Sequence, residues 1–375
     1  MNPRFLQCLL AGSVLLPLVG AEALPDNLRE PVSVLRSIRP EGRGNVAAAV
    51  AWKKLAAAEA RNLPALLAAM DGANDYALNW LRSAIETVAD RNRAALAGAV
   101  PELARFLADT VHSPRARFLA FELLSQADSA RAATLLPGFL NDPGNELRRA
   151  AVQQLSEGAS AKAKAGEKAA AVTDFQKALA AAREADQIEG IAKQLTELGE
   201  KVDLQKTFGW VTRWKVIGPF DNAGGAGFER AFAPEQGVDF AAEVEGMKGR
   251  VAWRDFESKS DYGLVDFNQP FTSLKSVTGY AAAEFWSDSA RPVELRLGCK
   301  NGWKVWLNGK FLFARDEYHR GVEIDQYRLA AQLQPGRNVI LVKCLQNEQT
   351  EDWTKEWEFQ LRVTDVQGTP IVSTK

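Results

Sequence analysis

Two different hydrophobic patterns divide the chain near residue 204. Before this point apolar residues recur at helical spacing from about Val46, in a segment that is rich in alanine. After it, apolar and polar residues alternate from Trp210 to Ile217, which predicts a β-strand that stops at Gly218 and Pro219. The sequence therefore predicts a multidomain protein with a helical first part and an all-β second part that begins at about residue 205.

The second part contains a series of short strands. Further alternating runs predict strands at residues 250–256, 276–287, 292–299, 303–307, 310–315, 325–329, 338–345 and 356–364. Turn residues separate them and no long helix intervenes, so we expect an antiparallel β-sandwich over residues 205–375. Asn308 and Gly309 join two of the runs and both tolerate the positive φ of a hairpin turn. Residues 339–342 are apolar on both faces, which predicts a central strand covered by the preceding helices.

The helical part contains an internal repeat. Pro64, Pro101 and Pro137 recur at intervals of about 36 residues, and we expect each to lie near the start of a helix. A second helix follows in each repeat, with its first, fifth and ninth positions on one buried stripe, while the arginine after the first position is expected at the edge. Ala116, Arg117, Ala120 and Leu124 illustrate this pattern.

This pattern resembles HEAT-type repeats, which stack helix pairs into an α-solenoid, over residues 46–157; a plain helical bundle is the alternative. Residues 158–204 resemble a single tetratricopeptide-like helix pair that caps the solenoid. Prolines and glycines in residues 24–45 predict an irregular lead-in.

The first 23 residues have the three parts of a secretory signal peptide. Arg4 gives a positive start, residues 5–19 are apolar, and Ala21 and Ala23 place small residues before a cleavage site. The apolar run is too short and too interrupted to span a bilayer comfortably, although a retained anchor or a buried helix is the alternative. We expect cleavage after Ala23, export to the periplasm or beyond, and no membrane span in the mature chain.

Charge and motifs narrow the function further. Lys plus Arg number 46 against 47 for Asp plus Glu, and no basic run occurs, so we expect no nucleic-acid partner. We found no catalytic motif and no ligand-spaced histidines, and we expect no catalytic residues, metal or cofactor. Loss of Cys8 with the signal peptide leaves Cys299 and Cys344, both directed to an apolar face, as either a disulfide or two buried thiols.

Residues 276–365 carry a resemblance to a known fold. Its signature is Leu295-Arg296-Leu297-Gly298-Cys299-Lys300-Asn301-Gly302-Trp303-Lys304-Val305-Trp306-Leu307-Asn308-Gly309, followed by Gln334-Pro335-Gly336-Arg337-Asn338 and an apolar strand. This segment resembles the galactose-binding-like jelly roll, a non-catalytic sugar-binding-like domain of many glycoside hydrolases. The whole layout is similar to a group of exported bacterial HEAT-repeat proteins. Related modules carry a carboxylate where this chain has Lys300, so calcium is not expected at that turn.

The predicted ligand site lies beside the hairpin of residues 303–313. Its candidate residues are Asn301, Trp303, Tyr318, His319, Arg320 and Trp353. We expect Trp303 or Trp353 to stack on a sugar ring while the other side chains contact hydroxyl groups. The alternative is an internally satisfied loop in which Arg320 pairs with Asp325. A further aromatic residue, Trp306, is either exposed or buried beneath the helices.

The sequence thus favours an exported binding protein. In this interpretation the β-sandwich binds a glycan, and the α-solenoid is a scaffold that holds a protein partner on its concave face. A purely structural protein-interaction scaffold and a glycan-active hydrolase are the two alternatives.

Overall fold

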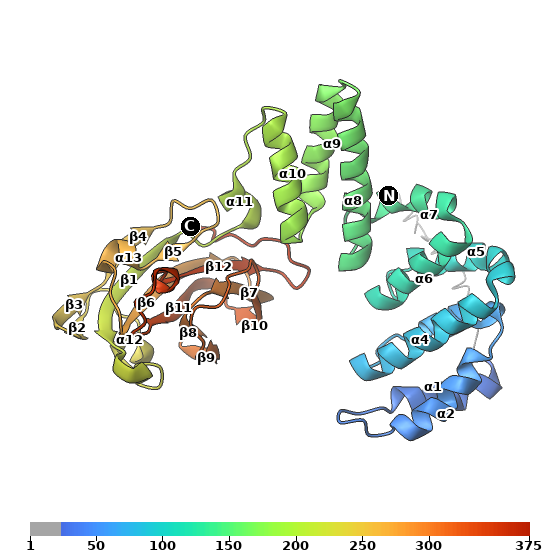
Figure 1. The fold of residues 1–375 in the computed structure, drawn as a ribbon, viewed down its shortest axis with the longest axis horizontal. Coiled ribbons are helices and arrows are strands. Elements are labelled where there is room, and N and C mark those ends of the chain that lie inside the picture. Colours follow the sequence, from blue (N-terminus) through green and yellow to red (C-terminus); the bar gives the residue numbers. More distant parts are fainter. Residues whose placement is uncertain (1–23) are drawn as a thin grey trace, which may run out of the picture. The chain divides into compact units, whose positions relative to one another are not determined.

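The computed structural model describes residues 24–375 (Figure 1), so the predicted signal peptide lies outside the described residues. Contacts divide the chain into two compact units, Met1–Leu147 and Arg148–Lys375. The change from helix to strand falls between residues 208 and 213, close to the position that the hydrophobic pattern indicates. Among the described residues, no helix combines the length and the apolar character that crossing a membrane requires.

The first unit is helical. Its elements are α1 (Asp26–Arg36), α2 (Asn45–Ala56), η1 (Ala60–Asn62), α3 (Leu63–Ala68), α4 (Asp75–Arg91), α5 (Arg93–Ala108), α6 (Pro114–Ala127), α7 (Ser129–Leu135) and η2 (Leu136–Phe139). Its buried apolar side chains form one continuous core. The stripe expected on the second helix of the repeat is present, since Ala116, Ala120 and Leu124 are all buried on α6.

Two prolines lie inside helices of this unit, where the sequence predicts an irregular segment and the start of a helix. Residues 24–45 are not an irregular lead-in, because α1 occupies much of the segment. Leu28, Val32 and Leu35 recur on one face of this helix and are buried, and Pro31 lies on the same stripe. Their burial outweighs the single backbone hydrogen bond that a proline removes. Pro101 likewise lies inside α5 instead of opening a helix.

Arg117 is buried rather than placed at the edge of its helix. Only 1% of its surface is exposed, and its guanidinium donates two hydrogen bonds, of 2.9 and 2.7 Å, to the carboxylate of Asp142. Its Nε donates a third to the carbonyl of Leu107 at 2.9 Å. A guanidinium and a carboxylate match in a two-pronged geometry, so this pair fastens the loop before the next helix to α6.

The second unit combines helices with two β-sheets. It holds α8 (Asn145–Lys164, which begins just before the boundary), α9 (Lys168–Ala181), α10 (Ala185–Glu197), α11 (Leu204–Phe208) and the short helices η3 (Ala223–Gly225), α12 (Ala233–Gln236), α13 (Asn268–Phe271) and η4 (Asp352–Thr354). Its strands are β1 (Arg213–Asp221), β2 (Glu243–Gly246), β3 (Gly249–Ala252), β4 (Arg254–Glu257), β5 (Val265–Asp266), β6 (Val277–Ser287), β7 (Arg291–Cys299), β8 (Gly302–Leu307), β9 (Lys310–Arg315), β10 (Tyr327–Leu333), β11 (Gly336–Gln346) and β12 (Glu358–Thr364).

The strands form a β-sandwich, as the alternating pattern predicts. One sheet has the order β4-β1-β6-β11-β8-β9 and the other β10-β7-β12-β5, and β2 and β3 form a separate hairpin. All neighbouring strands are antiparallel. Alternate side chains of both large sheets meet in one core, where Val216 and Val342 share a cluster with Leu295 and Leu361. The turn between β8 and β9 has positive φ at Asn308 and Gly309, as their hairpin role requires.

Strand β11 is central and buried on both faces, but its cover differs from the expected one. The outer face of its sheet is covered by the segment 222–253, which packs with Leu341 and Trp306 in a second apolar cluster, so helices before residue 204 are not the cover. Lys343 fixes this cover. Its fully buried Nζ donates to the carbonyl of Arg230 and to Glu235, both at 2.8 Å. Burial lowers the pKa of Lys343, which the hydrogen bond and charge of Glu235 partly offset.

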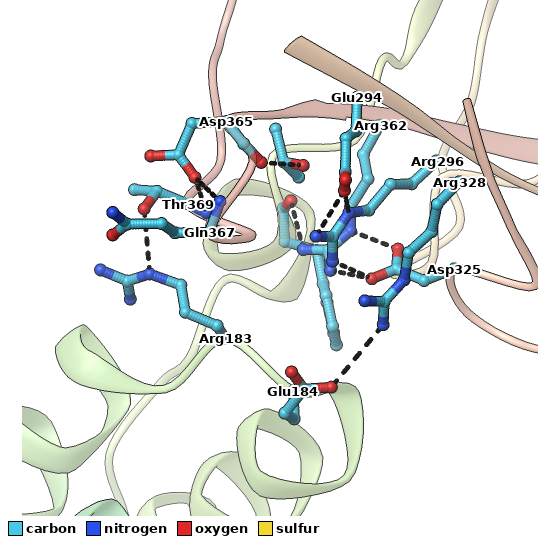
Figure 2. A network of polar contacts seen from close by, with 12 residues as sticks. Arg183, Glu184, Glu294, Arg296, Asp325, Arg328, Arg362, Asp365, Gln367 and Thr369 are labelled. Atoms are coloured by element: carbon cyan, nitrogen blue, oxygen red, sulfur yellow. Dashed lines mark hydrogen bonds and ion pairs between the residues drawn. The ribbon is translucent and has the colours of Figure 1, made fainter. Parts of the chain in front are cut away.

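A polar network joins the helix pair α9 and α10 to the four-stranded sheet (Figure 2). At the turn between these helices, Arg183 donates to Thr369 at 3.2 Å and Glu184 lies 3.8 Å from Arg328. Deeper in the network, Arg296 and Arg362 both donate to Asp325, as Figure 2 shows.

Asp325 stays ionised in this network because of its two arginine partners. Burial alone would raise the pKa of Asp325, but the hydrogen bonds and charges of Arg362 and Arg296 hold it below its usual range. The network lies within the second unit, which contains α9 and α10 together with the sheets.

The Asp325→Asn variant is expected to lose about 3–5 kcal/mol of unfolding free energy, because it leaves the buried Arg362 without its counter-ion and Arg296 with Glu294 as its remaining carboxylate partner. Urea unfolding followed by tryptophan fluorescence measures this loss. The control is Glu184→Gln, whose partner Arg328 is partly exposed, and it is expected to cost less than about 1 kcal/mol. Equal losses in the two variants would contradict a buried ionic centre.

The contribution of Asp325 is also expected to depend on pH. The folded-state pKa of Asp325 lies below its unfolded value of about 3.9, so its stabilisation is complete above that value. As the pH falls from about 4 through the folded pKa, the carboxylate gains a proton and the stabilisation is lost. Urea titrations from pH 7 to about pH 3 should therefore show the difference between wild type and Asp325→Asn shrinking, and a constant difference would refute this assignment.

Candidate functional site

Two loops of the β-sandwich bring three half-buried polar side chains and one exposed aromatic ring together. One joins β9 to β10 and carries Tyr318 and His319, and the other joins β11 to β12 and carries Asn347 and Trp353. The Nε2 atom of His319 lies 2.8 Å from Oδ1 of Asn347. The imidazole also packs edge-on against Trp353, with ring centroids 5.3 Å apart. We call these four residues the loop site.

Trp353 presents an exposed ring on a fixed backbone. Its surface is 61% exposed, whereas the next residue, Thr354, is buried. The Thr354 hydroxyl donates to the carbonyl of Gln349 at 2.9 Å, and the ammonium of Lys275 donates to the carbonyl of Thr354 at 2.7 Å. The short helix η4 is thereby held in place, so an approaching ligand meets a ring that needs little ordering.

His319 is oriented by its backbone and by its partner. Its φ of 56° is in the left-handed region, which residues other than glycine seldom occupy. The following backbone N–H, that of Arg320, donates to the carbonyl of Lys300 at 3.1 Å and ties this loop to the turn before β8. Because Oδ1 of Asn347 accepts hydrogen bonds only, Nε2 of His319 is the donor and Nδ1 is left to contact other groups.

Tyr318 lies half-buried beneath the loop. Its hydroxyl accepts a hydrogen bond from Nδ2 of Asn222 at 3.2 Å, and that amide also donates to the carbonyl of Gln346 at 3.1 Å. Burial raises the pKa of Tyr318 to about 12, so the phenol keeps its proton at neutral pH and can donate it to a hydrogen-bond acceptor.

The structure separates the remaining predicted residues from this site. Trp303 is fully buried in the sandwich core, with its ring centroid 4.9 Å from that of Tyr327, so it offers no ring to a ligand. It shares the inward face of β8 with Val305, which the alternation of the strand requires.

Asn301 is a supporting residue rather than a ligand contact, since only 1% of its surface is exposed. Its Nδ2 donates to Oε1 of Gln346 at 3.2 Å and to the carbonyl of Glu356 at 3.1 Å. These bonds connect the turn before β8 with the ends of the loop that carries Trp353.

Arg320 is exposed beside the loop site. Its Nε lies 3.4 Å from a carboxylate oxygen of Glu317, and its expected partner Asp325 is held by Arg296 and Arg362 instead. The internally paired loop therefore exists in part, with a different acid as the partner of Arg320.

Sequence reasoning missed Asn347 and Asn222. Asn347 lies in the polar stretch from which only Trp353 was selected, and its proximity to His319 depends on the pairing of β11 with β8. Asn222 comes from the end of β1, and no spacing pattern in the sequence connects it with Tyr318. Both amides become visible only when the strand order is known.

The two cysteines of the second unit meet in the core just below these segments. Cys299 and Cys344 are buried free thiols with their sulfur atoms 3.8 Å apart. Burial raises the pKa of Cys344, so its thiol is a poor nucleophile. Within residues 24–375, no group of three or more His, Cys, Asp or Glu side chains is placed to hold a metal ion.

Comparisons with known proteins give no family assignment. No protein-family model and no curated protein matches the chain. Solved structures that match part of it include an anti-sigma factor domain-containing protein from Clostridium clariflavum, with 12% identity over 44% of this chain and 45% of that chain and a TM-score of 0.26. The chain thus spans about half the length of that protein.

Two PA14 domains match as well. The PA14 domain of MpAFP antifreeze protein is 12% identical over 44% of this chain and 86% of its own, with a TM-score of 0.26. The PA14 sugar-binding domain from RTX adhesin is 13% identical over 41% of this chain and 89% of its own, with a TM-score of 0.23. TM-scores this low do not establish a shared fold, so the function has to be argued from the residues of the site.

The two tryptophans are expected to differ sharply in their effect on stability. Trp303→Ala should cost about 3–5 kcal/mol because it opens a cavity in the core, whereas Trp353→Ala should cost no more than about 0.5 kcal/mol. Urea unfolding of both variants by circular dichroism measures the difference. Comparable losses would show that Trp353 is part of the core and not an available surface ring.

Proposed function

We propose that this chain is an exported, non-catalytic carbohydrate-binding protein and that the loop site of its β-sandwich holds a sugar ring. One observation carries the proposal: the exposed ring of Trp353 lies beside the imidazole of His319, which is itself oriented by Asn347. An exposed aromatic ring on an ordered backbone, flanked by fixed hydrogen-bonding groups, is an arrangement suited to sugar recognition.

The chemistry of the loop site fits a sugar. Axial C–H groups of a pyranose carry a partial positive charge and pack on the electron-rich face of an indole ring. The hydroxyl groups around the sugar need both donors and acceptors, which the hydroxyl of Tyr318 and the side chains of His319 and Asn347 supply. Buried hydrogen bonds of Asn301 and Thr354 support both loops, which reduces the entropy lost on binding.

The affinity of such a site is expected to be modest. One stacked ring and a few hydrogen bonds on an open surface give about 4–8 kcal/mol, which corresponds to dissociation constants on the order of millimolar to micromolar. Specific recognition by the protein would then depend on repeated engagement along a polymeric glycan.

The finer assignments belong to the same proposal. We assign the first unit to a HEAT-like α-solenoid, supported by the buried stripe of α6 and the Arg117–Asp142 pair, and the sandwich to a galactose-binding-like jelly roll. Export rests on the signal-peptide pattern of residues 1–23. A protein partner on the helical unit stays a prediction, and the hollow between η1 and α5, lined by Arg61, Asn92 and Glu102, is a place to look for it.

Affinity electrophoresis of residues 24–375 through gels containing xylan, galactan, glucomannan or pullulan tests the proposal. At least one polysaccharide is expected to retard the wild type, and Trp353→Ala should weaken the binding at least about tenfold because the stacking surface is lost. His319→Ala should weaken it less. The control is Phe311→Ala, which removes an exposed ring from β9.

Retardation of wild type and Trp353→Ala to the same extent would reject the loop site. Release of reducing sugars by the purified protein would replace the binding role by the hydrolase alternative. If no polysaccharide retards the wild type, the protein-interaction scaffold becomes the better interpretation.

A further inference from the structure

A groove lies on the outer face of the six-stranded sheet, on strands β4, β1 and β6. Its volume is about 290 Å³, close to the lower end of small-molecule sites in proteins. Strand register places Lys215 of β1 between Asp255 of β4 and Ala282 of β6. Because the side chain of Ala282 is a single methyl group, it leaves space at the bottom of the groove.

The groove begins where the cover of the sheet ends. One step further along the same face, Ile217 and Tyr280 are paired and buried under the segment 222–253. At the edge of that cover lies Phe240. Its ring packs edge-on against Trp253 and forms one wall of the groove. The hollow therefore lies beside the edge of the cover, above the small side chain of Ala282.

A second aromatic ring, that of Trp286, lines the groove at the end of β6. Its backbone is held by a hydrogen bond from its N–H to Oγ of Ser373 and by another from the N–H of Thr374 to its carbonyl. The ammonium of Lys375 lies 3.7 Å from the centroid of the indole. One face of the ring is therefore open to polar groups. A ligand that stacks on this face would displace the ammonium of Lys375.

Charged groups of both signs surround these rings. Lys215 donates to Asp255 at 2.6 Å, and Glu284 pairs with Arg337. Both carboxylates keep exposed surface, with 88% of the Asp255 side chain and 43% of the Glu284 side chain accessible. Arg213 and Lys375 also line the groove, so cations and carboxylates together provide donors and acceptors for neighbouring hydroxyl groups.

We propose that this groove is a second carbohydrate site that takes one uncharged pyranose ring, with Trp286 and Phe240 contacting its C–H groups and Asp255, Lys215 and Glu284 its hydroxyl groups. The choice of a carbohydrate as the ligand class rests on the proposed function. The groove itself stands on strands β4, β1 and β6 and shares no residue with the loop site. Two such sites on one domain would bind a branched or polymeric glycan more tightly than either alone.

Site-resolved nuclear magnetic resonance can test the two sites separately. Residues 24–375 are labelled with [15N]tryptophan, and the indole signals of the two rings are assigned with Trp286→Phe and Trp353→Phe. The probes are the methyl β-D-glycosides of glucose, galactose and xylose and, as an anion, D-glucuronate, each added to on the order of 100 mM. A saturable shift of the Trp286 signal with at least one neutral glycoside is the expected result.

Isosteric variants test whether ligand binding in the groove causes the shift of the Trp286 signal. Asp255→Asn and Glu284→Gln should each weaken the binding reported by Trp286 about tenfold, because each removes a charged acceptor, and should leave the Trp353 response unchanged. The matched control is Glu243→Gln, which alters an exposed ion pair with Arg250 on the hairpin β2–β3 outside the groove.

Each remaining outcome has one meaning. A silent Trp286 signal overturns the groove whether or not Trp353 responds, and a response of Trp353 alone leaves the proposed function intact. A response of Trp286 alone supports the groove and rejects the loop site. Tighter binding of D-glucuronate than of the neutral glycosides, or equal binding by the isosteric variants and wild type, overturns the ligand class or the residue roles assigned to the groove.

Discussion

The second unit depends on the burial of strand β11 on both of its faces. This strand pairs with β6 on one side and with β8 on the other. Its inward side chains, among them Ile340 and Val342, join the core between the sheets, and outward Leu341 joins the apolar cluster beneath the cover. A strand of this kind can form only if both a second sheet and an outer cover are present, so its sequence constrains the architecture around it.

A buried lysine on this strand shows how strong that constraint is. Lys343 faces outward where an apolar side chain would normally lie, yet it is fully buried and satisfied by Glu235 and by backbone carbonyls of the cover. An unpaired ammonium at this depth would carry a large desolvation cost, so the cover has to supply partners for Lys343, and Glu235 and the carbonyl of Arg230 are these partners. The edge of this cover is also the wall of the groove that contains Phe240.

The end of β11 connects the core to the loop site. Gln346 accepts a hydrogen bond from Asn301 and donates to the carbonyl of Thr354, and the following residue, Asn347, contacts His319. The exposed ring of Trp353 is therefore attached to the central strand β11 through a short series of hydrogen bonds. Rigid support of this kind is what allows a shallow site with one stacking ring to select its ligand.

The sequence predicts the strands well and the site only in part, for physical reasons. Alternation locates β6, β7, β8 and β11 because the side-chain period of a strand is two residues. It does not reveal which face is covered, and so Trp303 was expected at the surface although it lies in the core. Contacts such as Asn222 with Tyr318 depend on strand order, which no local pattern contains.

The helical unit illustrates the same limit. Its apolar stripe follows from helical periodicity. The burial of Arg117, however, depends on its pairing with Asp142, which lies in the loop before α8. Long polar side chains at helix edges are usually solvated, and only the position of a partner reverses that expectation.

A crystal structure of residues 24–375 with an oligosaccharide tests the central claim, carbohydrate binding at the loop site, most directly. The account predicts a pyranose ring stacked at about 4 Å from the indole of Trp353, with hydroxyl groups within about 3 Å of His319 or Asn347. An oligosaccharide bound elsewhere on the chain, with the Trp353 ring bare, would contradict it.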